Sequence, residues 1–214
     1  MKIGILGGTF DPVHRGHTYL ATAVLKTFDL SRVDLMVSRV PPHKETRGIT
    51  SACHRQAMLE LDLSQESSLF PSRWEMDQPG PSYTIDTLDH FKSTHPENKY
   101  CFLAGSDALQ ELHLWKDYDR LLAEHCLIFV QRPGFTVELT QLNLSSSLLE
   151  RVQTVNEGDR PQIRFGASFL IQLNAPTISA SAIRKMTASG KSPTPDILSP
   201  KVLRYVEEHH LYAT

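Results

Sequence analysis

The chain opens with a short apolar run that passes directly into a glycine-rich turn and then into an amphipathic segment. Residues 2–6 have the length and composition of a buried strand, and Gly7 and Gly8 follow them. Residues 16–28 then carry Leu20, Val24, Leu25 and Phe28 at the spacing of one helix face. A strand, a tight turn and a helix in this order predict an α/β fold, because such units pack as helices against a parallel sheet.

The same alternation continues along the chain. Further strands are expected at residues 33–37, 100–104, 127–130 and 169–173, and helices at 51–63, 84–92, 108–112, 117–124, 145–155, 179–189 and 200–210. In the helix at 51–63 we expect Ala57, Met58 and Leu61 to face inward. The pattern predicts a doubly wound, mostly parallel sheet, with ligands bound at the carboxyl ends of its strands. We expect one domain over residues 1–214, with a C-terminal helical part from about 175 to 214 packed on it.

Composition restricts the class of protein. Lys plus Arg is 22 and Asp plus Glu is 24, a formal net charge of −2, so there is no general attraction to nucleic acid or to a membrane surface. The three cysteines, Cys53, Cys101 and Cys126, form no C-x-x-C pair, which suits a reducing compartment. No signal peptide is recognisable and no stretch approaches the roughly 18 apolar residues of a membrane span. We therefore expect a cytoplasmic protein whose phosphate site, if present, is local.

The turn after the first strand has the chemistry of a phosphate site. The string from Gly7 to His17 reads GGTFDPVHRGH, with His14 and His17 three residues apart. Glycines let a backbone approach phosphate closely, and His17 falls in the first turn of the next helix, where free N–H groups and the helix dipole favour an anion. The string does not fit G-x-G-x-x-G, which argues against a dehydrogenase.

This string resembles the H-x-G-H signature of a nucleotidyltransferase superfamily, and in particular that of its bacterial nicotinate mononucleotide adenylyltransferases. Further segments resemble the same family in order along the chain. They are Pro41-Pro42-His43-Lys44, Ser82–Leu88, Gly105–Leu109 with Trp115-Lys116, Arg132-Pro133-Gly134, and Ile178–Arg184. One position departs from the pattern: Ala180 stands where the family more often has a hydroxyl residue, which puts one nucleotide contact in doubt.

The resemblance implies a Rossmann-like fold and a set of roles. His17 would bind the α-phosphate of ATP, His14 the neighbouring phosphates, and Arg184 the β- and γ-phosphates. The rest of the ATP site would comprise Gly7, Gly8, Thr9, Phe10, Gly16, Gly105, Ser106, Asp107, Arg132, Ser179 and Ser181. The mononucleotide would meet Lys44, Tyr83, Thr84, Trp115 and Lys116, with the nicotinate carboxylate held by main-chain N–H groups near Thr84 and Lys116.

Several residues in this set have a plain structural alternative. Ser179 could be an ordinary helix N-cap, Lys44 a solvated loop residue, and Trp115 part of the core beside Leu112 and Leu114. Indole can also stack on a flat pyridine ring. These alternatives remain open at the level of sequence.

The expected chemistry needs no general base. The attacking 5′-phosphate has a second pKa near 6 and is largely a dianion at neutral pH. The enzyme has to align the reactants and offset charge on the transferred phosphoryl group, a task suited to histidine, arginine and helix N-termini. Mg²⁺ is expected with the polyphosphate, held mainly by phosphate oxygens and water, so we expect no protein metal-ligand set.

Three other functions remain in view. A pantetheine-phosphate adenylyltransferase would share the first string but would not account for the segments at 82–88 and Trp115. A nicotinamide mononucleotide adenylyltransferase is closer, and only substrate kinetics separates it from the favoured assignment. A module that binds ATP without turnover could lose His17 or Arg184 freely, whereas both are present. Oligomeric state, monomer or homodimer, is left open.

Overall fold

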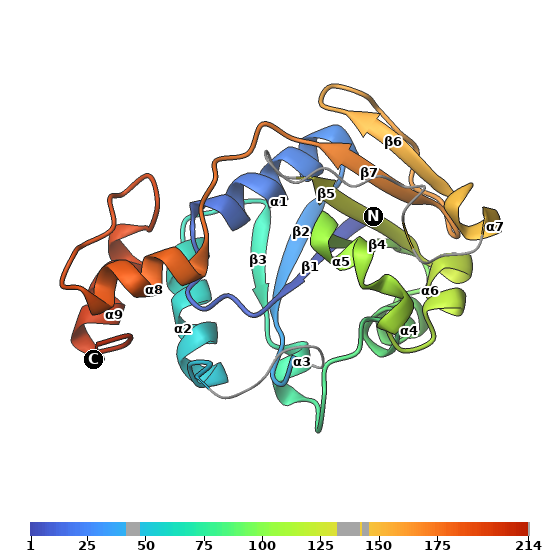
Figure 1. The fold of residues 1–214 in the computed structure, drawn as a ribbon. Helices are drawn as coiled ribbons and strands as arrows, with labels where there is room; N and C mark the ends of the chain where they lie inside the picture. The colour runs from blue at the N-terminus through green and yellow to red at the C-terminus, as the bar shows by residue number, and fades with distance from the viewer. Residues whose placement is uncertain (42–47, 132–141, 143–145, 214) are drawn as a thin grey trace.

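The computed structural model describes residues 1–41, 48–131, 142 and 146–213, and these residues build a seven-stranded sheet (Figure 1). The strand order is β3-β2-β1-β4-β5-β7-β6, and every neighbouring pair is parallel. The strands are β1 (Lys2–Gly8), β2 (Arg32–Val37), β3 (Leu69–Ser72), β4 (Lys99–Gly105), β5 (Cys126–Gln131), β6 (Val152–Asn156) and β7 (Ser168–Gln172). The doubly wound parallel fold expected from the sequence is confirmed.

Helices cover both faces of this sheet (Figure 1). They are α1 (Arg15–Thr27), α2 (Ala52–Leu63), α3 (Trp74–Asp77), α4 (Thr84–Thr94), α5 (Ser106–Gln110), the 3₁₀ turn η1 (Leu112–Leu114), α6 (Tyr118–Glu124), α7 (Ser146–Leu149), α8 (Ala180–Ala188) and α9 (Pro200–Glu208). Apolar residues of α1, α2, α8 and α9 pack in one core cluster, and those of α4, α5 and α6 pack in another.

Successive residues of the central strands alternate between these two clusters. Along β4, Cys101 and Leu103 belong to the first cluster, whereas Tyr100, Phe102 and Ala104 belong to the second. This period of two is the geometry of a strand buried on both faces. It explains why the strands read as continuous apolar runs in the sequence.

The sheet reverses its direction of growth between β1 and β4. Chain order runs outward from β1 through β2 and β3 on one side, and from β4 through β5 on the other. The segments that follow β1 and β4 consequently lead to helices on opposite faces of the sheet. In doubly wound sheets this divergence leaves a crevice at the carboxyl ends of the two strands, here at Gly8 and Gly105.

The prediction of a helix over residues 145–155 is wrong. The chain makes the short helix α7 and then the edge strand β6, which pairs with β7. Leu148, Val152 and Val155 have helix-like spacing and are all buried, but Val152 and Val155 are buried in a strand. The same apolar spacing fits a helix or a strand, and pairing with β7 makes the segment a strand. The sequence of the segment itself carries no sign of this pairing.

Two smaller expectations also needed correction. Strand β3 was not foreseen, since it has four residues and contains Pro71, which is tolerated because β3 is an edge strand. On α2 only Met58 of the three expected residues is fully buried; Ala57 and Leu61 are partly exposed, while Arg55 and Asp62 are buried. Among the described residues, no helix is both long enough and apolar enough to cross a membrane.

Candidate active site

A cleft of about 630 Å³ opens at the carboxyl ends of β1 and β4. This volume lies within the range of about 300–1,000 Å³ that is usual for small-molecule sites. Four groups of expected residues line it, from the turn after β1, the turn before α4, the segment after β4, and α8. They are Gly7, Gly8, Thr9, Phe10 and His17; Tyr83 and Thr84; Gly105, Asp107, Trp115 and Lys116; and Ser181 and Arg184.

The glycines of the first turn make room for aromatic rings. An ideal Cβ on Gly7 would lie 2.6 Å from Cζ of Phe102, and one on Gly8 would lie 3.0 Å from Cζ of Phe10. On Gly16 a Cβ would lie 3.0 Å from the ring of His14. Gly7 and Gly8 also line the cleft, whereas Gly16 does not. The role of Gly16 that the structure displays is therefore to admit the ring of His14.

The start of α1 holds the two histidines together. His14 is the extended residue that precedes the helix, and its main-chain N–H donates to Nδ1 of His17 at 3.2 Å. The two rings stack with centroids 3.8 Å apart, and the ring of Phe10 meets that of His17 edge-on at 4.9 Å. Because Nδ1 of His17 accepts a hydrogen bond, the proton of the neutral ring belongs on Nε2. His17 lines the cleft, while His14 is 3% exposed and is not among the lining residues.

Arg184 enters the cleft from the middle of α8. Its Nη1 donates to the main-chain oxygen of Asp11 at 2.6 Å, and Nη2 donates to the hydroxyl of Ser181 at 3.3 Å. Ser179 accepts the main-chain N–H of Ala182 at 3.1 Å and is thus an N-cap; it does not line the cleft, whereas Ala180 does. The contact that Ser179 makes in the structure is thus that of an ordinary helix N-cap.

The opposite wall is aromatic. Trp115 is partly buried and meets Phe102 edge-on at 6.1 Å between ring centroids. Nζ of Lys116 lies 5.0 Å from the centroid of Tyr83 and donates to both carboxylate oxygens of Asp86 at 2.8 Å. The hydrogen bond with Asp86 raises the pKa of Lys116. This wall presents flat aromatic groups beside Thr84, the first residue of α4, whose N–H has no acceptor within its own helix.

Ser106 does not line the cleft, and two further expected residues cannot be placed relative to it. Ser106 begins α5 and is buried. Lys44 and Arg132 lie outside the described residues, as do the remaining parts of their two segments, Pro42-His43 and Pro133-Gly134.

Sequence reasoning missed a fully buried arginine behind the turn. Arg55 is 1% exposed and donates to four main-chain carbonyls, those of Thr9, Ser38, Arg39 and Thr50, over distances from 2.7 to 3.2 Å. Burial lowers the pKa of Arg55, and the nearby charge of Asp11 opposes that change. Arg55 thereby ties the turn after β1 to the segment after β2. No local pattern marks it, because arginine in a helix usually faces water.

Two acidic residues of the cleft were missed as well. Asp11 is 4% exposed, and its carboxylate accepts hydrogen bonds from Thr50 and Tyr212. Glu75 is 3% exposed and accepts the Thr87 hydroxyl at 2.8 Å. Burial raises the pKa of the Glu75 carboxyl, and hydrogen bonding from Thr87 acts in the opposite direction. Both carboxylates belong to the scaffold of the cleft.

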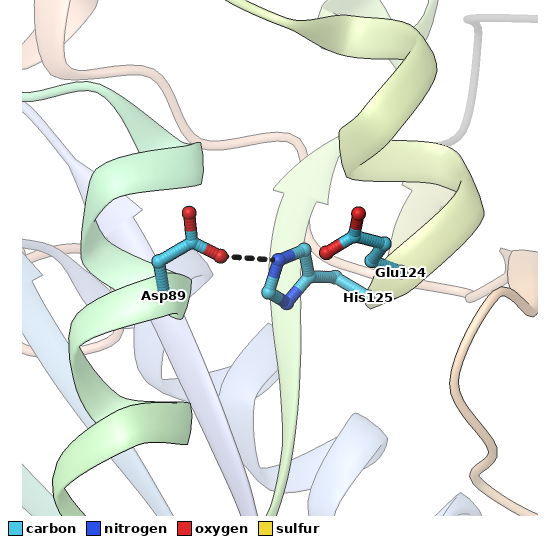
Figure 2. Close-up of side chains that lie close together, drawn as sticks. All are labelled: Asp89, Glu124 and His125. Carbon is cyan, nitrogen blue, oxygen red and sulfur yellow. Dashed lines mark hydrogen bonds and ion pairs between the residues drawn. The ribbon is translucent and has the colours of Figure 1, made fainter.

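A separate titratable cluster lies just before the amino end of β5, whereas the cleft lies at the carboxyl ends of the strands (Figure 2). Nε2 of His125 is 3.0 Å from Oδ1 of Asp89, and one ligand atom from each of Asp89, Glu124 and His125 lies within 4.8 Å of the others. Arg120 pairs with both carboxylates, at 2.8 and 3.7 Å, and Lys92 approaches Glu124 at 3.9 Å. Arg120 also pairs with Asp117 at 3.9 Å, so we interpret the cluster as part of an ion-pair network.

The comparisons with known proteins agree with this geometry. The cytidylyltransferase-like family model matches residues 5–186. The nicotinate-nucleotide adenylyltransferase of Bacillus subtilis (strain 168) is 35% identical over 211 residues, which cover 99% of this chain and 98% of the relative.

Solved structures resemble the fold. The Plasmodium falciparum nicotinic acid mononucleotide adenylyltransferase complexed with NaAD superposes with a TM-score of 0.74 at 21% identity, covering 99% of this chain and 97% of that chain. The same enzyme complexed with APC gives a TM-score of 0.73 at 20% identity, over 99% and 96% of the two chains. The family resemblance noted in the sequence is confirmed. The chain belongs to the cytidylyltransferase-like family and, within it, to the nicotinate-nucleotide adenylyltransferases.

Proposed function

We propose that this protein transfers the adenylyl group of ATP to nicotinate mononucleotide, giving nicotinate adenine dinucleotide and pyrophosphate in NAD biosynthesis. The observation that carries the proposal is the composition of one cleft. His17, Arg184 and the start of α8, which are groups of the kind that bind phosphate, line it together with the aromatic wall of Tyr83 and Trp115. A site of this kind accommodates a polyphosphate beside a flat ring.

The side chains that would bind phosphate are proposed to supply the catalytic contribution. The donor on Nε2 of His17 would bind the α-phosphate and stabilise the charge that develops there during in-line displacement. Arg184 would hold the β- and γ-phosphates of the leaving pyrophosphate, with the hydroxyl of Ser181 beside it. The attacking phosphate is already a dianion, so alignment and charge stabilisation account for the chemistry without a general base.

The second histidine has a less direct position. The contact expected between His14 and the neighbouring phosphates stays a prediction, because the ring is buried in this structure. Its stacking on His17 supports a contribution to the orientation of that ring.

The remaining ATP contacts come from the ends of β1 and β4. Gly7, Gly8, Thr9 and Phe10 would follow the phosphates and sugar, and Gly105 and Asp107 would border the adenosine. Ser106, Gly16 and Ser179 would support these contacts from behind. Arg132 on the adenine side, and Lys44 near the mononucleotide phosphate, are kept as predictions from the family pattern.

Specificity for the acid is proposed to come from the start of α4 and the residues after η1. The indole of Trp115 would stack on the pyridine ring, with Tyr83 nearby. Main-chain N–H groups at Thr84 and Lys116 would donate hydrogen bonds to the nicotinate carboxylate. Such donors favour a carboxylate over an amide, because hydrogen bonds to an ionised acceptor are stronger and an amide nitrogen brings competing hydrogens.

The metal ion is proposed to be Mg²⁺, carried by ATP. Both oxygens of the Asp11 carboxylate accept hydrogen bonds from the protein, so the residue is already committed to the scaffold. Among the described residues, the carboxylate and histidine side chains that lie close enough together to hold a metal ion are Asp89, Glu124 and His125, just before β5. None of these three lines the cleft. Phosphate oxygens and water would therefore supply most of the ligands, and the ion would offset negative charge on the phosphates.

We also propose that residues 1–214 act as one nucleotidyltransferase domain in the cytoplasm, as a monomer or a homodimer, without a nucleic-acid or membrane partner. The near-neutral charge and the three free cysteines support this setting.

Turnover tests the function directly. Purified protein supplied with ATP, Mg²⁺ and nicotinate mononucleotide is expected to release pyrophosphate and form the deamido dinucleotide, and the amide mononucleotide is expected to be a markedly poorer substrate. Equal or faster turnover of the amide would assign the protein as a nicotinamide mononucleotide adenylyltransferase. Tight ATP binding without turnover of either would favour a nucleotide-sensing module.

A further inference from the structure

The buried carboxylate of Asp11 joins parts of the chain that are far apart in sequence. Its Oδ1 accepts a 2.7 Å hydrogen bond from the hydroxyl of Tyr212, across 201 positions of sequence. Its Oδ2 accepts a 3.2 Å hydrogen bond from the main-chain N–H of Thr50. Asp11 thus connects the turn after β1 with the residue before the N-cap of α2 and with the C-terminal end. None of these three residues has a role in the proposed reaction.

Asp11 also contacts Arg184, but mainly through its main chain. Nη1 of Arg184 lies 2.6 Å from the main-chain oxygen of Asp11 and 4.0 Å from its carboxylate Oδ2. An arginine and a carboxylate in reach of one another ordinarily form a short, often bidentate pair. Here Tyr212 and Thr50 each engage one carboxylate oxygen. The guanidinium of Arg184 is therefore not held in a short pair with this carboxylate. Its side chain is 33% exposed and lines the cleft.

The end of the chain holds Tyr212 firmly in this place. After α9 the N–H of Leu211 donates to the carbonyl of Val206 at 2.9 Å, and the side chains of Leu211 and Tyr212 pack against the first core cluster. His210 and Tyr212 have φ values of 49° and 63°. This left-handed region is unfavourable for residues other than glycine, so tertiary contacts must sustain it. Figure 1 shows the C-terminal end beside α8 and α9.

The hydroxyl of Tyr212 remains a donor under all working conditions. Burial, together with the neighbouring Asp11 carboxylate, raises the pKa of the phenol far above its ordinary value. The hydrogen bond to Asp11 is accordingly not a pH switch. It is a permanent part of the scaffold around the phosphate end of the cleft.

We infer that Tyr212 is a positioning residue for Arg184, because its hydrogen bond occupies the Asp11 carboxylate and leaves the guanidinium available to the β- and γ-phosphates of ATP. Without that hydroxyl, Oδ1 of Asp11 would be buried with one donor fewer. Arg184 is the neighbouring cation that can move to replace it, since four main-chain carbonyls hold Arg55. The pair between Arg184 and Asp11 would then shorten and draw the guanidinium away from the phosphates. The inference rests on the proposed function.

The chain offers a matched pair of variants. Tyr212→Phe removes one hydroxyl and keeps the ring that packs on the core. Tyr205→Phe removes another partly buried hydroxyl of the C-terminal part, which lies 2.9 Å from Nδ1 of His54 on α2. Neither Tyr205 nor His54 lines the cleft. The second variant therefore controls for a general loosening of the C-terminal part.

Steady-state kinetics and ATP binding give separate readouts. Tyr212→Phe is expected to raise both the KM for ATP and the Kd for ATP measured without mononucleotide by about tenfold, the effect of one hydrogen bond to a charged group. The KM for the mononucleotide should change less than twofold, and Tyr205→Phe should match the wild type in all three. In an Arg184→Ala background, Tyr212→Phe should add no further loss of ATP affinity, because the residue through which it acts is gone.

Three results would overturn the inference: unchanged ATP affinity in Tyr212→Phe, an equal loss of affinity for both substrates, or an undiminished tenfold loss in the Arg184→Ala background. A wild-type protein that binds ATP but turns over neither mononucleotide would overturn the proposed function instead. The ATP titrations would still decide the role of Tyr212.

Discussion

The imidazole rings of His14 and His17 stack at 3.8 Å, and the main-chain N–H of His14 donates to Nδ1 of His17. One residue therefore sets both the ring plane and the tautomer of the other. The ring of Phe10 also packs edge-on against the ring of His17. A donor held in this way loses little orientational freedom when a phosphate arrives, which is the condition for strong electrostatic catalysis.

His17→Ala is expected to lower kcat by roughly 10²–10³, as the loss of one preorganised donor typically does. ATP affinity should change little, because Arg184 and the helix N–H groups still bind the ground-state phosphates. Single-turnover kinetics with an ATP titration measures both quantities. His95→Ala, at an exposed histidine away from the cleft, serves as the control. A near-normal kcat in His17→Ala would require the mechanism to be rebuilt around His14 and Arg184.

Gly16→Ala is expected to reduce kcat by about tenfold while the fold persists. The new methyl group would lie 3.0 Å from the ring of His14 and force it to shift by a few tenths of an ångström. His17 would follow through the stack and the hydrogen bond, and misplacement of a catalytic group by about 1 Å can cost about 10²-fold. Circular dichroism would establish the fold and pyrophosphate release the rate. Full activity in this variant would show that His14 does not control the orientation of His17.

Trp115→Ala is expected to raise the KM for the mononucleotide far more than the KM for ATP. Loss of one aromatic stack should cost about 0.5–1.5 kcal/mol beyond the buried area. Trp74→Ala is the matched control, since Trp74 stacks on His90 and does not line the cleft. If Trp115→Ala instead lowers the melting temperature strongly and leaves both KM values unchanged, the residue belongs to the core.

Glu75→Gln is expected to make the protein more stable at neutral pH and to have a smaller effect in acid. Burial raises the pKa of Glu75 in the folded state above its unfolded value. Above that raised pKa the folded protein therefore bears an unfavourable buried charge, and this penalty is relieved as pH falls through it. Glutamine keeps the acceptor for Thr87 without the charge.

The measurement is the free energy of unfolding by urea at pH 8 and pH 5 for the wild type and Glu75→Gln. The difference between the two proteins should shrink at the lower pH. Glu66→Gln, at an exposed carboxylate, should show no such trend. A difference that grows on acidification would contradict the assigned sign.

Local sequence was sufficient for β1, the turn and α1. Their signals, an apolar run, glycines and apolar residues at helical spacing, involve neighbours in the chain, and the structure has these elements within a residue or two of the expected bounds. The histidine string and the later segments also identified the family, through their resemblance to its motifs in the same order along the chain. The helix predicted from apolar spacing at residues 145–155 was wrong. That spacing also fits a strand, and pairing with β7 makes β6 a strand.

The sequence alone determined the parallel α/β class, the family and thirteen of the residues that line the cleft. Only the tertiary structure decided which polar groups support them. Arg55, Glu75 and the pair of Asp11 and Tyr212 have no distinctive local pattern, since their partners come from other parts of the chain, 201 positions away in the last case. A buried charge or hydroxyl is stable only where such partners meet it. Their roles therefore became visible only after the sheet had brought those segments together.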